Sequence, residues 1–514
     1  MQTLKFRKGK DFKLIGSVAF INLLLAAAAL MKDIMLASYL GTTYEADSLF
    51  LAFFITDMVG NNLIGSAIGT SCIPVFSKLY VNDRKEDLYK SIKAINILFF
   101  TATLIISFIL MILGKSIVNY SAGGFTEASK ILSLKLLYLL TASIILYPLI
   151  AIGNASLQVL GKFKVSALAP VLFNFIFLLG TTYCYINNIP VDSGIYYIVF
   201  SIILGLICIA ALIYKFNNVD NDFRYKRAKP TSKNIKEVLP IVKIFLPYLL
   251  ILFLSQTMLY VERNLASGFR PGSVAALNYA YRLSQFPVWV LAAAVGTVTF
   301  PKVSKLRELG DYEKLYEIIE KSLWTIIIFT IPMAVILYIL RIPIISILFQ
   351  RGTFDDSSLT VTADILAGYS IAVIGQSISS LCLKYLMSLE KIQTTVIIFF
   401  ISSCINIFLD FFIVRRIGLI GIGYGAAVGA AVNAALMLAA LNIKINRDID
   451  SKVKKLIKVL AANMLLAIIC ILSNYLWNLG ICSSKFLYKF VYAILTAVLC
   501  VGFYYFALKY SKSI

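Results

Sequence analysis

Fourteen long apolar runs, separated by short polar segments, make up most of the sequence. Each has about 20 residues or more, enough for a helix to cross a hydrocarbon core of about 30 Å. Because 60% of the residues are hydrophobic and only 14% are charged, no water-soluble core could absorb them. The chain is therefore predicted to be an all-α polytopic membrane protein. The runs lie near 14–40, 46–76, 92–113, 131–160, 165–187, 193–214, 238–260, 274–300, 322–347, 360–387, 393–414, 418–442, 456–478 and 486–508.

The net charge of +22 follows the membrane topology rather than a nucleic-acid partner. Lys and Arg collect in every second loop, about three to one on the side of the N-terminus, as the positive-inside rule requires. Both termini are therefore expected in the cytoplasm, and no nucleic acid is expected to bind. Residues 1–13 are short and basic, and no small-residue cleavage site follows the first run, so that run is expected to stay in the protein.

The chain contains an internal repeat. Residues 67–92 match residues 294–319 without a gap, with 11 identities over 26 positions. A repeat at this distance indicates a duplicated lobe, as in many transporters. We predict a first lobe over 1–216, a basic cytoplasmic linker over 217–236, a second lobe over 237–445 and two extra helices over 446–514. Since each lobe has six helices, an even number, the two repeats enter the membrane in the same direction.

The residue types present argue against an enzyme. The sequence has no His, its eight Cys residues are scattered singly, and no paired-carboxylate loop is evident. The thiols are expected to be buried in apolar surroundings. We expect no cofactor beyond a coupling ion, Na⁺ or H⁺.

Charged residues inside the apolar runs are the informative positions of the first lobe, because each costs about 2.5–3.5 kcal/mol at mid-membrane unless it has a partner or faces water. Lys32 and Asp33 are neighbours about 100° apart on a helix, so we expect that they do not pair with each other. Lys32 either lines a functional cavity or reaches to the interface. Asp47 and Asp57 are further candidates, and Asp57 could instead form a polar seam with the asparagines that follow it.

In the second lobe, Glu262 aligns with Asp33, and Arg282 is a further charged candidate. Asn406 and Asp410 are four residues apart and share one helical face. Together with Glu262 they supply hard oxygen ligands for Na⁺ or for a shared proton. The alternative is an ordinary polar contact between helices. Arg263 and Asp364 are also charged residues within these runs.

The glycine-rich stretch 421–429 has the spacing of a dinucleotide-binding loop, but it lies inside an apolar run with no strand before it. We therefore predict that its small residues allow close packing of two helices.

The stretch 277–287 reads LNYAYRLSQFP, and the stretch 348–354 reads LFQRGTF. These motifs resemble YADRLxQFP and LFERGAF of the MurJ (MviN) lipid II flippases, which belong to the multidrug/oligosaccharidyl-lipid/polysaccharide (MOP) exporter superfamily. Lys32-Asp33 stands where the family has Arg-Asp, and Asp47 matches the aspartate of its TDAFFVAF. The resemblance covers nearly the whole chain. It implies a fourteen-helix MurJ-like fold with a V-shaped cavity between the lobes, whose cations hold a lipid-linked pyrophosphate.

The sequence departs from the family pattern at its second span, where the family has FKxPNLLRRLxAEGAF. A lysine, a proline, two arginines and a glutamate are replaced, and Tyr281 stands in place of the aspartate of YADRL. The cations that remain are Arg282 and Lys32. In the corresponding stretch this chain has Phe54, Thr56, Asp57, Gly60, Asn61 and Gly65.

The resemblance implies an alternating-access flippase for lipid II or a related undecaprenyl-diphosphate-linked glycan. It implies a monomer in the bacterial cytoplasmic membrane, surrounded by membrane lipids and driven by the membrane potential or a cation gradient. Glu262, Asn406 and Asp410 lie where the family's second lobe resembles a Na⁺ site, and Lys32, Asp33, Asp47, Asp57 and Arg282 are the candidate substrate-binding residues. A cation-coupled multidrug antiporter of the same superfamily and an inactive membrane scaffold are the alternatives.

Overall fold

The structure is a computed structural model. It describes residues 8–217, 232–441 and 449–479, and within 489–504 only 489, 491, 492, 495, 496, 498–500, 502 and 504. The described residues form helices and their connections, with no strand among them. Thirteen helices in this part are long and apolar enough to cross a membrane, and they coincide one by one with the first thirteen predicted runs. The predicted run at 486–508 falls largely outside the described residues.

Contacts divide the chain into two compact units, Met1–Gln256 and Thr257–Ile514. The division falls inside α10 (Ser232–Ser267), whose Ile241 and Phe245 belong to the hydrophobic core of the first unit. The four-part division predicted from the sequence stays a prediction, since residues 218–231 of its linker are outside the described ranges.

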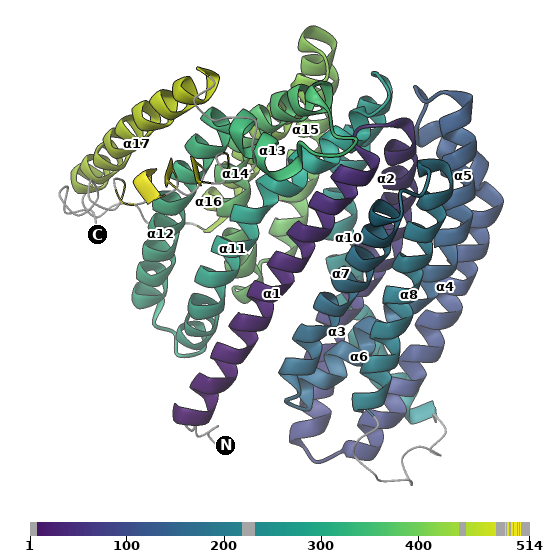
Figure 1. The fold of residues 1–514 in the computed structure, drawn as a ribbon. Helices are drawn as coiled ribbons and strands as arrows, with labels where there is room; N and C mark the ends of the chain where they lie inside the picture. Colours follow the sequence, from purple (N-terminus) through teal and green to yellow (C-terminus); the bar gives the residue numbers. More distant parts are fainter. Residues whose placement is uncertain are drawn as a thin grey trace. The chain divides into compact units, whose positions relative to one another are not determined.

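The first unit is a bundle of long helices. In Figure 1, α4, α5, α7 and α8 run side by side, and α1 contacts α7 while α3 contacts α6. Buried apolar side chains of α3, α4 and α6 form its main core together with the first part of α10. The bounds are α1 Lys8–Leu40, α2 Tyr44–Asp57, the π-helix η1 Met58–Gly65, α3 Ser66–Val81, α4 Lys85–Ser121, α5 Glu127–Thr141, the 3₁₀ turn η2 Ala142–Ile145, α6 Leu146–Val159, α7 Phe163–Ile186 and α8 Val191–Asn217.

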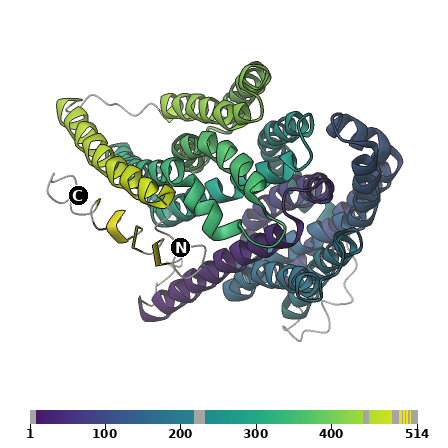
Figure 2. The same ribbon diagram turned by 45° about the horizontal axis from the view of Figure 1, so that its top comes forward.

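The second unit is built around α14, which contacts α11, α12, α13, α15 and α16. α17 packs against α12 and lies at the outside of this unit in Figure 2. Their bounds are α11 Ser273–Glu308, α12 Tyr312–Ile339, α13 Arg341–Phe349, α14 Asp356–Ser388, α15 Ile392–Ile417, α16 Ile420–Leu441 and α17 Ile449–Asn478.

Helix boundaries reproduce the internal repeat. α3 ends at Val81 and α11 at Glu308, which are 227 positions apart. The next helices begin at Lys85 and Tyr312, again 227 positions apart. Both copies therefore interrupt the helix at the same register, which confirms that the repeated sequence encodes a repeated structure.

A π-helix in the first unit accounts for a difference in length between the copies. The helical stretches begin at Tyr44 and Ser273, which are 229 positions apart, but end 227 positions apart, so the first copy holds two extra residues. Met58–Gly65 is a π-helix, whereas α11 is α-helical throughout. Because π-helical turns contain more residues than α-helical ones, we infer that this segment takes up the difference. Asp57 directly precedes it.

The backbones of α14 and α16 are in contact. A Cβ atom added at Gly368 would lie 2.6 Å from Gly423 Cα, and one added at Gly375 would lie 2.6 Å from the carbonyl carbon of Ala430. Such approach requires glycine at both positions. The prediction that the run 421–429 packs two helices is confirmed.

The predicted run 322–347 is interrupted in the structure, because α12 ends at Ile339 and α13 begins at Arg341. Pro343 is the cause. Its ring would collide with the carbonyl group four residues earlier, that of Ile339, and it has no N–H to donate. In the first turn of a new helix neither property matters.

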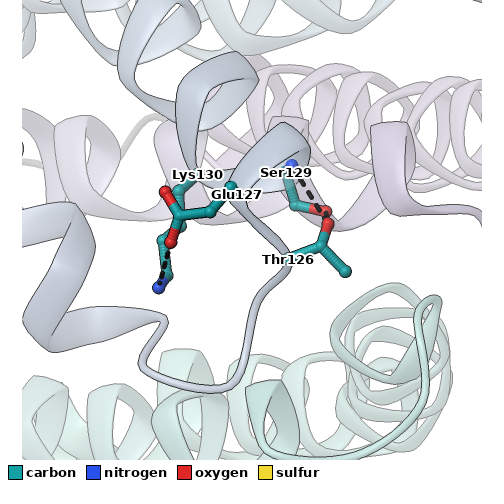
Figure 3. A network of polar contacts seen from close by, with 4 residues as sticks. All are labelled: Thr126, Glu127, Ser129 and Lys130. Carbon is teal, nitrogen blue, oxygen red and sulfur yellow. Dashed lines mark hydrogen bonds and ion pairs between the residues drawn. The ribbon is translucent and has the colours of Figure 1, made fainter.

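Side-chain caps define where several helices begin. Thr126 precedes α5, and its hydroxyl accepts a hydrogen bond of 3.3 Å from the backbone N–H of Ser129, while Lys130 Nζ lies 3.1 Å from Glu127 Oε1 (Figure 3). Asp355 caps α14 in the same way. Hydrogen bonds from the hydroxyl and the N–H of Ser358 hold the pKa of Asp355 below its usual value. These caps satisfy N–H groups that a helix leaves unpaired at its start.

Candidate functional site

Lys32 and Asp33 form an ion pair, so the expectation that they do not meet was wrong. Lys32 Nζ lies 2.9 Å from Asp33 Oδ1, and both side chains are buried. The expectation considered only the directions of the two Cα–Cβ bonds. The four methylene groups of lysine allow its ammonium group to bend back across that angle.

The ammonium group of Lys32 also faces an aromatic wall. It lies 4.9 Å from the ring centre of Phe177 on α7, a distance at which the negative face of the ring attracts a cation. Phe177 in turn packs edge to face with Phe53 and Phe173, at 6.4 and 6.1 Å between ring centres. Lys32 is thus held within the bundle and is not reaching for an interface.

The other two first-lobe candidates, Asp47 and Asp57, lie on α2, whereas Lys32 and Asp33 lie on α1. Asp57, at the end of the helix, accepts a hydrogen bond of 3.0 Å from Asn62 Nδ2, and the Tyr147 hydroxyl of α6 lies 3.5 Å from its other oxygen. Asp47 is buried in the first turn of α2, where free N–H groups stabilise a negative charge. Ten residues of helix separate the two carboxyl groups, about 15 Å along the axis. The structure therefore does not gather them at one point.

Replacing Asp33 with asparagine is expected to lower the free energy of unfolding by about 3–5 kcal/mol, because the buried ammonium group of Lys32 would lose its counter-charge. The double variant Lys32→Met/Asp33→Leu, which removes both charges, is expected to recover most of this loss. Thermal unfolding of the purified protein measures both effects. A double variant as unstable as the single one would contradict this account of the pair.

In the second unit, Asn406 and Asp410 are completely buried on the face of α15 that meets α16, which confirms that they share one face. Asn406 Nδ2 donates a hydrogen bond of 3.1 Å to the carbonyl oxygen of Gly425. Asp410 Oδ1 lies against Gly425 and the Asn406 side chain against Gly429, in space that a Cβ atom at either glycine would occupy. The glycines of α16 therefore make room for these two polar side chains.

Three oxygen atoms at this point have no hydrogen-bond partner among the described residues: both carboxylate oxygens of Asp410 and Oδ1 of Asn406. A buried carboxylate without a partner is costly, so the arrangement requires a positively charged or hydrogen-donating species. Glu262 of α10 is also buried, and it is near enough for its charge to repel that of Asp410. A second negative charge strengthens the requirement.

Glu262 is held by groups that the sequence did not indicate. The hydroxyl of Tyr369, on α14, donates a hydrogen bond to Glu262 Oε2. The ring of Tyr369 meets that of Tyr281 edge to face at 5.6 Å, and the guanidinium carbon of Arg263 lies 6.0 Å from the centre of the Tyr281 ring. Arg282, the neighbour of Tyr281, is partly exposed, and its charge acts on Arg263.

These residues fit a small monovalent cation. The oxygens of Glu262, Asp410 and Asn406 are hard ligands of the kind that Na⁺ prefers. With both carboxylates of Glu262 and Asp410 ionised, two buried negative charges would face the one positive charge of the buried Arg263, and one monovalent cation would balance them. Among the described residues, no group of three or more His, Cys, Asp or Glu side chains is arranged to hold a metal ion.

Two of the sequence motifs meet in one aromatic cluster. Tyr279 of the stretch 277–287 packs against Phe349 and Phe354 of the stretch 348–354, at 5.5 and 5.8 Å between ring centres. Arg351 donates hydrogen bonds to the carbonyl groups of Ile347 and Leu348 at the end of α13. These contacts join α11 to α13 and to the connection that precedes α14.

A family model described as Lipid II flippase MurJ matches residues 36–497. The chain belongs to the MurJ family. The matched range includes Asp47, Asp57, Glu262, Arg282 and Asp410.

Comparison with individual MurJ relatives agrees. A protein named probable lipid II flippase MurJ from Rhizobium tropici is 24% identical over 349 residues, which are 66% of this chain and 64% of that protein. A solved structure of lipid II flippase MurJ in an inward closed conformation has a TM-score of 0.77 and 22% identity, covering 96% of this chain and 98% of that one. An inward-facing multidrug resistance MATE transporter of the MOP superfamily has a TM-score of 0.69 and 16% identity, covering 83% and 96%. The MurJ-like MOP fold predicted from the sequence is confirmed.

Sequence reasoning missed four residues that contribute to the second-unit site of this MurJ family member. Arg263 was singled out as a charge within an apolar run but not assigned to the site, although it adjoins Glu262. Gly425 and Gly429 belong to the glycine-rich run that the sequence assigned to helix packing but not to the site. Tyr369 has no distinguishing pattern.

Proposed function

We propose that this protein is an alternating-access flippase that carries lipid II or a related undecaprenyl-diphosphate-linked glycan across the bacterial cytoplasmic membrane. The observation that carries the proposal is the match of residues 36–497 to the MurJ family model. The membrane nature of the chain, with thirteen candidate spans in its described part, is consistent with it. In this proposal the protein acts as a monomer. Its basic loops favour a cytoplasmic position for both termini.

Arg282 is the main ligand of the diphosphate in this proposal. A guanidinium group binds phosphate oxygens through two parallel N–H bonds and keeps its charge at any physiological pH. Arg282 is partly exposed, which is compatible with contact to a polar headgroup. Lys32 supplies a weaker second charge, because Asp33 already neutralises it. With few cations left from the family pattern, a related glycan is as good a candidate as lipid II itself.

The coupling ion in this proposal is Na⁺, held by Glu262, Asn406 and Asp410. When bound, the ion supplies a positive charge that the membrane field drives, worth about 2.3 kcal/mol per 100 mV. Asp410 contributes the two oxygens that have no hydrogen-bond partner in the described ranges, and Asn406 contributes its Oδ1. The hydrogen bond from Asn406 to Gly425 ties these ligands to α16, so occupation of the site bears directly on the packing of α15 and α16.

Replacing Arg282 with alanine is expected to abolish flipping of a lipid-linked diphosphate in proteoliposomes, while Arg282→Lys keeps a small part of it. The lysine retains the charge but loses the paired N–H geometry. Accessibility of a labelled lipid II to an external enzyme measures the rate.

Arg307→Ala is the matched control for this experiment. Arg307 lies on the same helix, but its side chain pairs with Glu390 at 2.9 Å and with the backbone of Ser388. Its loss should leave flipping near the wild-type rate. Flipping by Arg282→Ala at the wild-type rate would refute the role of Arg282. Export of lipophilic cations without any lipid flipping would favour a multidrug antiporter instead.

A further inference from the structure

We propose that Tyr369 positions the Glu262 carboxylate in the cation site and thereby sets which monovalent cation the site prefers. The inference rests on the proposed function, in which Glu262, Asn406 and Asp410 hold the coupling ion. Tyr369 acts through its contact with Glu262, so it is a positioning residue.

The hydrogen bond between the two side chains is the first observation. Tyr369 hydroxyl donates to Glu262 Oε2, and both side chains are almost completely buried. A glutamate side chain has three rotatable bonds, and a directed bond from a rigid ring restricts all of them. With Oε2 held by the phenol, the orientation of the carboxylate is determined by where α14 places Tyr369.

Packing against a second aromatic ring supports the Tyr369 ring. It meets the Tyr281 ring edge to face at 5.6 Å, with 68° between the ring planes. Tyr281 in turn lies beneath the guanidinium group of Arg263, at 6.0 Å. The Tyr281 ring thus supports Tyr369 on the side of α11.

The position of Tyr369 along the chain connects the two halves of the cation site. Gly368, its neighbour, is in backbone contact with Gly423 of α16. Two residues further on, Gly425 accepts the hydrogen bond from Asn406. Tyr369 lies on α14, and Asn406 is hydrogen-bonded to α16, so the contact between these two helices links both residues. The α14–α16 pair thereby determines the spacing between Glu262 on α10 and the ligands on α15.

A cation site discriminates by size only if its ligands cannot relax around a larger ion. Tyr369→Phe keeps the ring and its packing but removes the hydroxyl, which releases Glu262. We expect the affinity for Na⁺ to fall about 10–100-fold, as when a group that orients a metal ligand is lost. The preference for Na⁺ over K⁺ should narrow at the same time.

The test is equilibrium binding of ²²Na⁺ to the purified full-length protein, with K⁺ and Li⁺ as competitors, for wild type, Tyr369→Phe, Glu262→Gln and the double variant. If the hydroxyl acts through Glu262, the double variant should bind no more weakly than Glu262→Gln alone.

Tyr385→Phe is the matched control. It removes another buried tyrosine hydroxyl of α14, which shares a hydrogen bond of 2.7 Å with Thr299. It should cost thermal stability without changing Na⁺ affinity or ion preference. An equal effect of the two Tyr→Phe variants on binding would overturn the inference, because it would show a general loss of packing.

The outcomes separate this inference from the proposed function. If wild type binds no Na⁺, the proposed Na⁺ coupling site and the role of Tyr369 are both wrong. If wild type binds Na⁺ and Asp410→Asn does not, but Tyr369→Phe binds it with wild-type affinity and preference, the proposed coupling site stands and only the role of Tyr369 is wrong. A selective loss in Tyr369→Phe supports it.

Discussion

The Asp410→Asn variant is expected to lose Na⁺ affinity by two to three powers of ten and with it any Na⁺ dependence of transport. Asp410 contributes two buried oxygens that have no hydrogen-bond partner in the described part of the chain. Removing one partner of a buried charge pair costs about 3–5 kcal/mol, and each 1.4 kcal/mol is a factor of ten in affinity. Equilibrium ²²Na⁺ binding measures the loss.

The same variant should not lose stability in the absence of Na⁺. Without the ion, the Asp410 charge is uncompensated, and an amide of the same shape removes that cost. Asp364→Asn is the control, since Asp364 is a partly exposed carboxylate in a membrane helix of the same unit. Na⁺ binding by Asp410→Asn with unchanged affinity, or an equal loss in Asp364→Asn, would contradict the site.

The Gly368→Ala variant is expected to destabilise the second unit by about 3 kcal/mol, at the upper end of what overpacking usually costs. Its Cβ atom would meet the backbone of α16, lying 2.6 Å from Gly423 Cα. Backbone atoms cannot turn aside as a flexible side chain does, so α14 and α16 would have to separate. Because the cation site depends on this helix pair, Na⁺ binding should weaken as well.

Gly69→Ala is the matched control, because a Cβ atom added there meets nothing within 4 Å. Alanine in a helix is intrinsically better than glycine by about 0.5–1 kcal/mol, so this variant should be as stable as wild type or slightly more so. Thermal unfolding of both variants, with and without Na⁺, is the measurement. Equal stability of the two variants would show that the close approach of α14 and α16 is unimportant.

Elements governed by local pattern could be predicted well. The first thirteen spans and the break that both repeats share depend on hydropathy and on neighbouring residues, and they appear where the sequence places them. The shared face of Asn406 and Asp410 follows from helical periodicity alone. The glycine-rich run of α16 was likewise assigned correctly to helix packing, because a dinucleotide loop needs a strand that an apolar run cannot provide.

Other features depend on groups that are far apart in the chain or on the reach of a long side chain. The pairing of Lys32 with Asp33 depends on the bending of a flexible side chain against Phe177, which no helical wheel describes. The two extra residues of the first copy are accommodated by a π-helix at 58–65, which hydropathy and helical periodicity do not predict.

By itself, the sequence determined the membrane spans, the duplicated lobes and the residue types available for charge compensation, because hydropathy and helical periodicity act over a few neighbouring residues. Only the tertiary structure decided which of those polar groups have partners. It left the oxygens of Asp410 without a hydrogen-bond partner among the described residues and brought Tyr369 to Glu262, more than a hundred positions away. A buried polar group is satisfied or left unsatisfied by whatever helix lies next to it, and that neighbour is set by packing between distant segments.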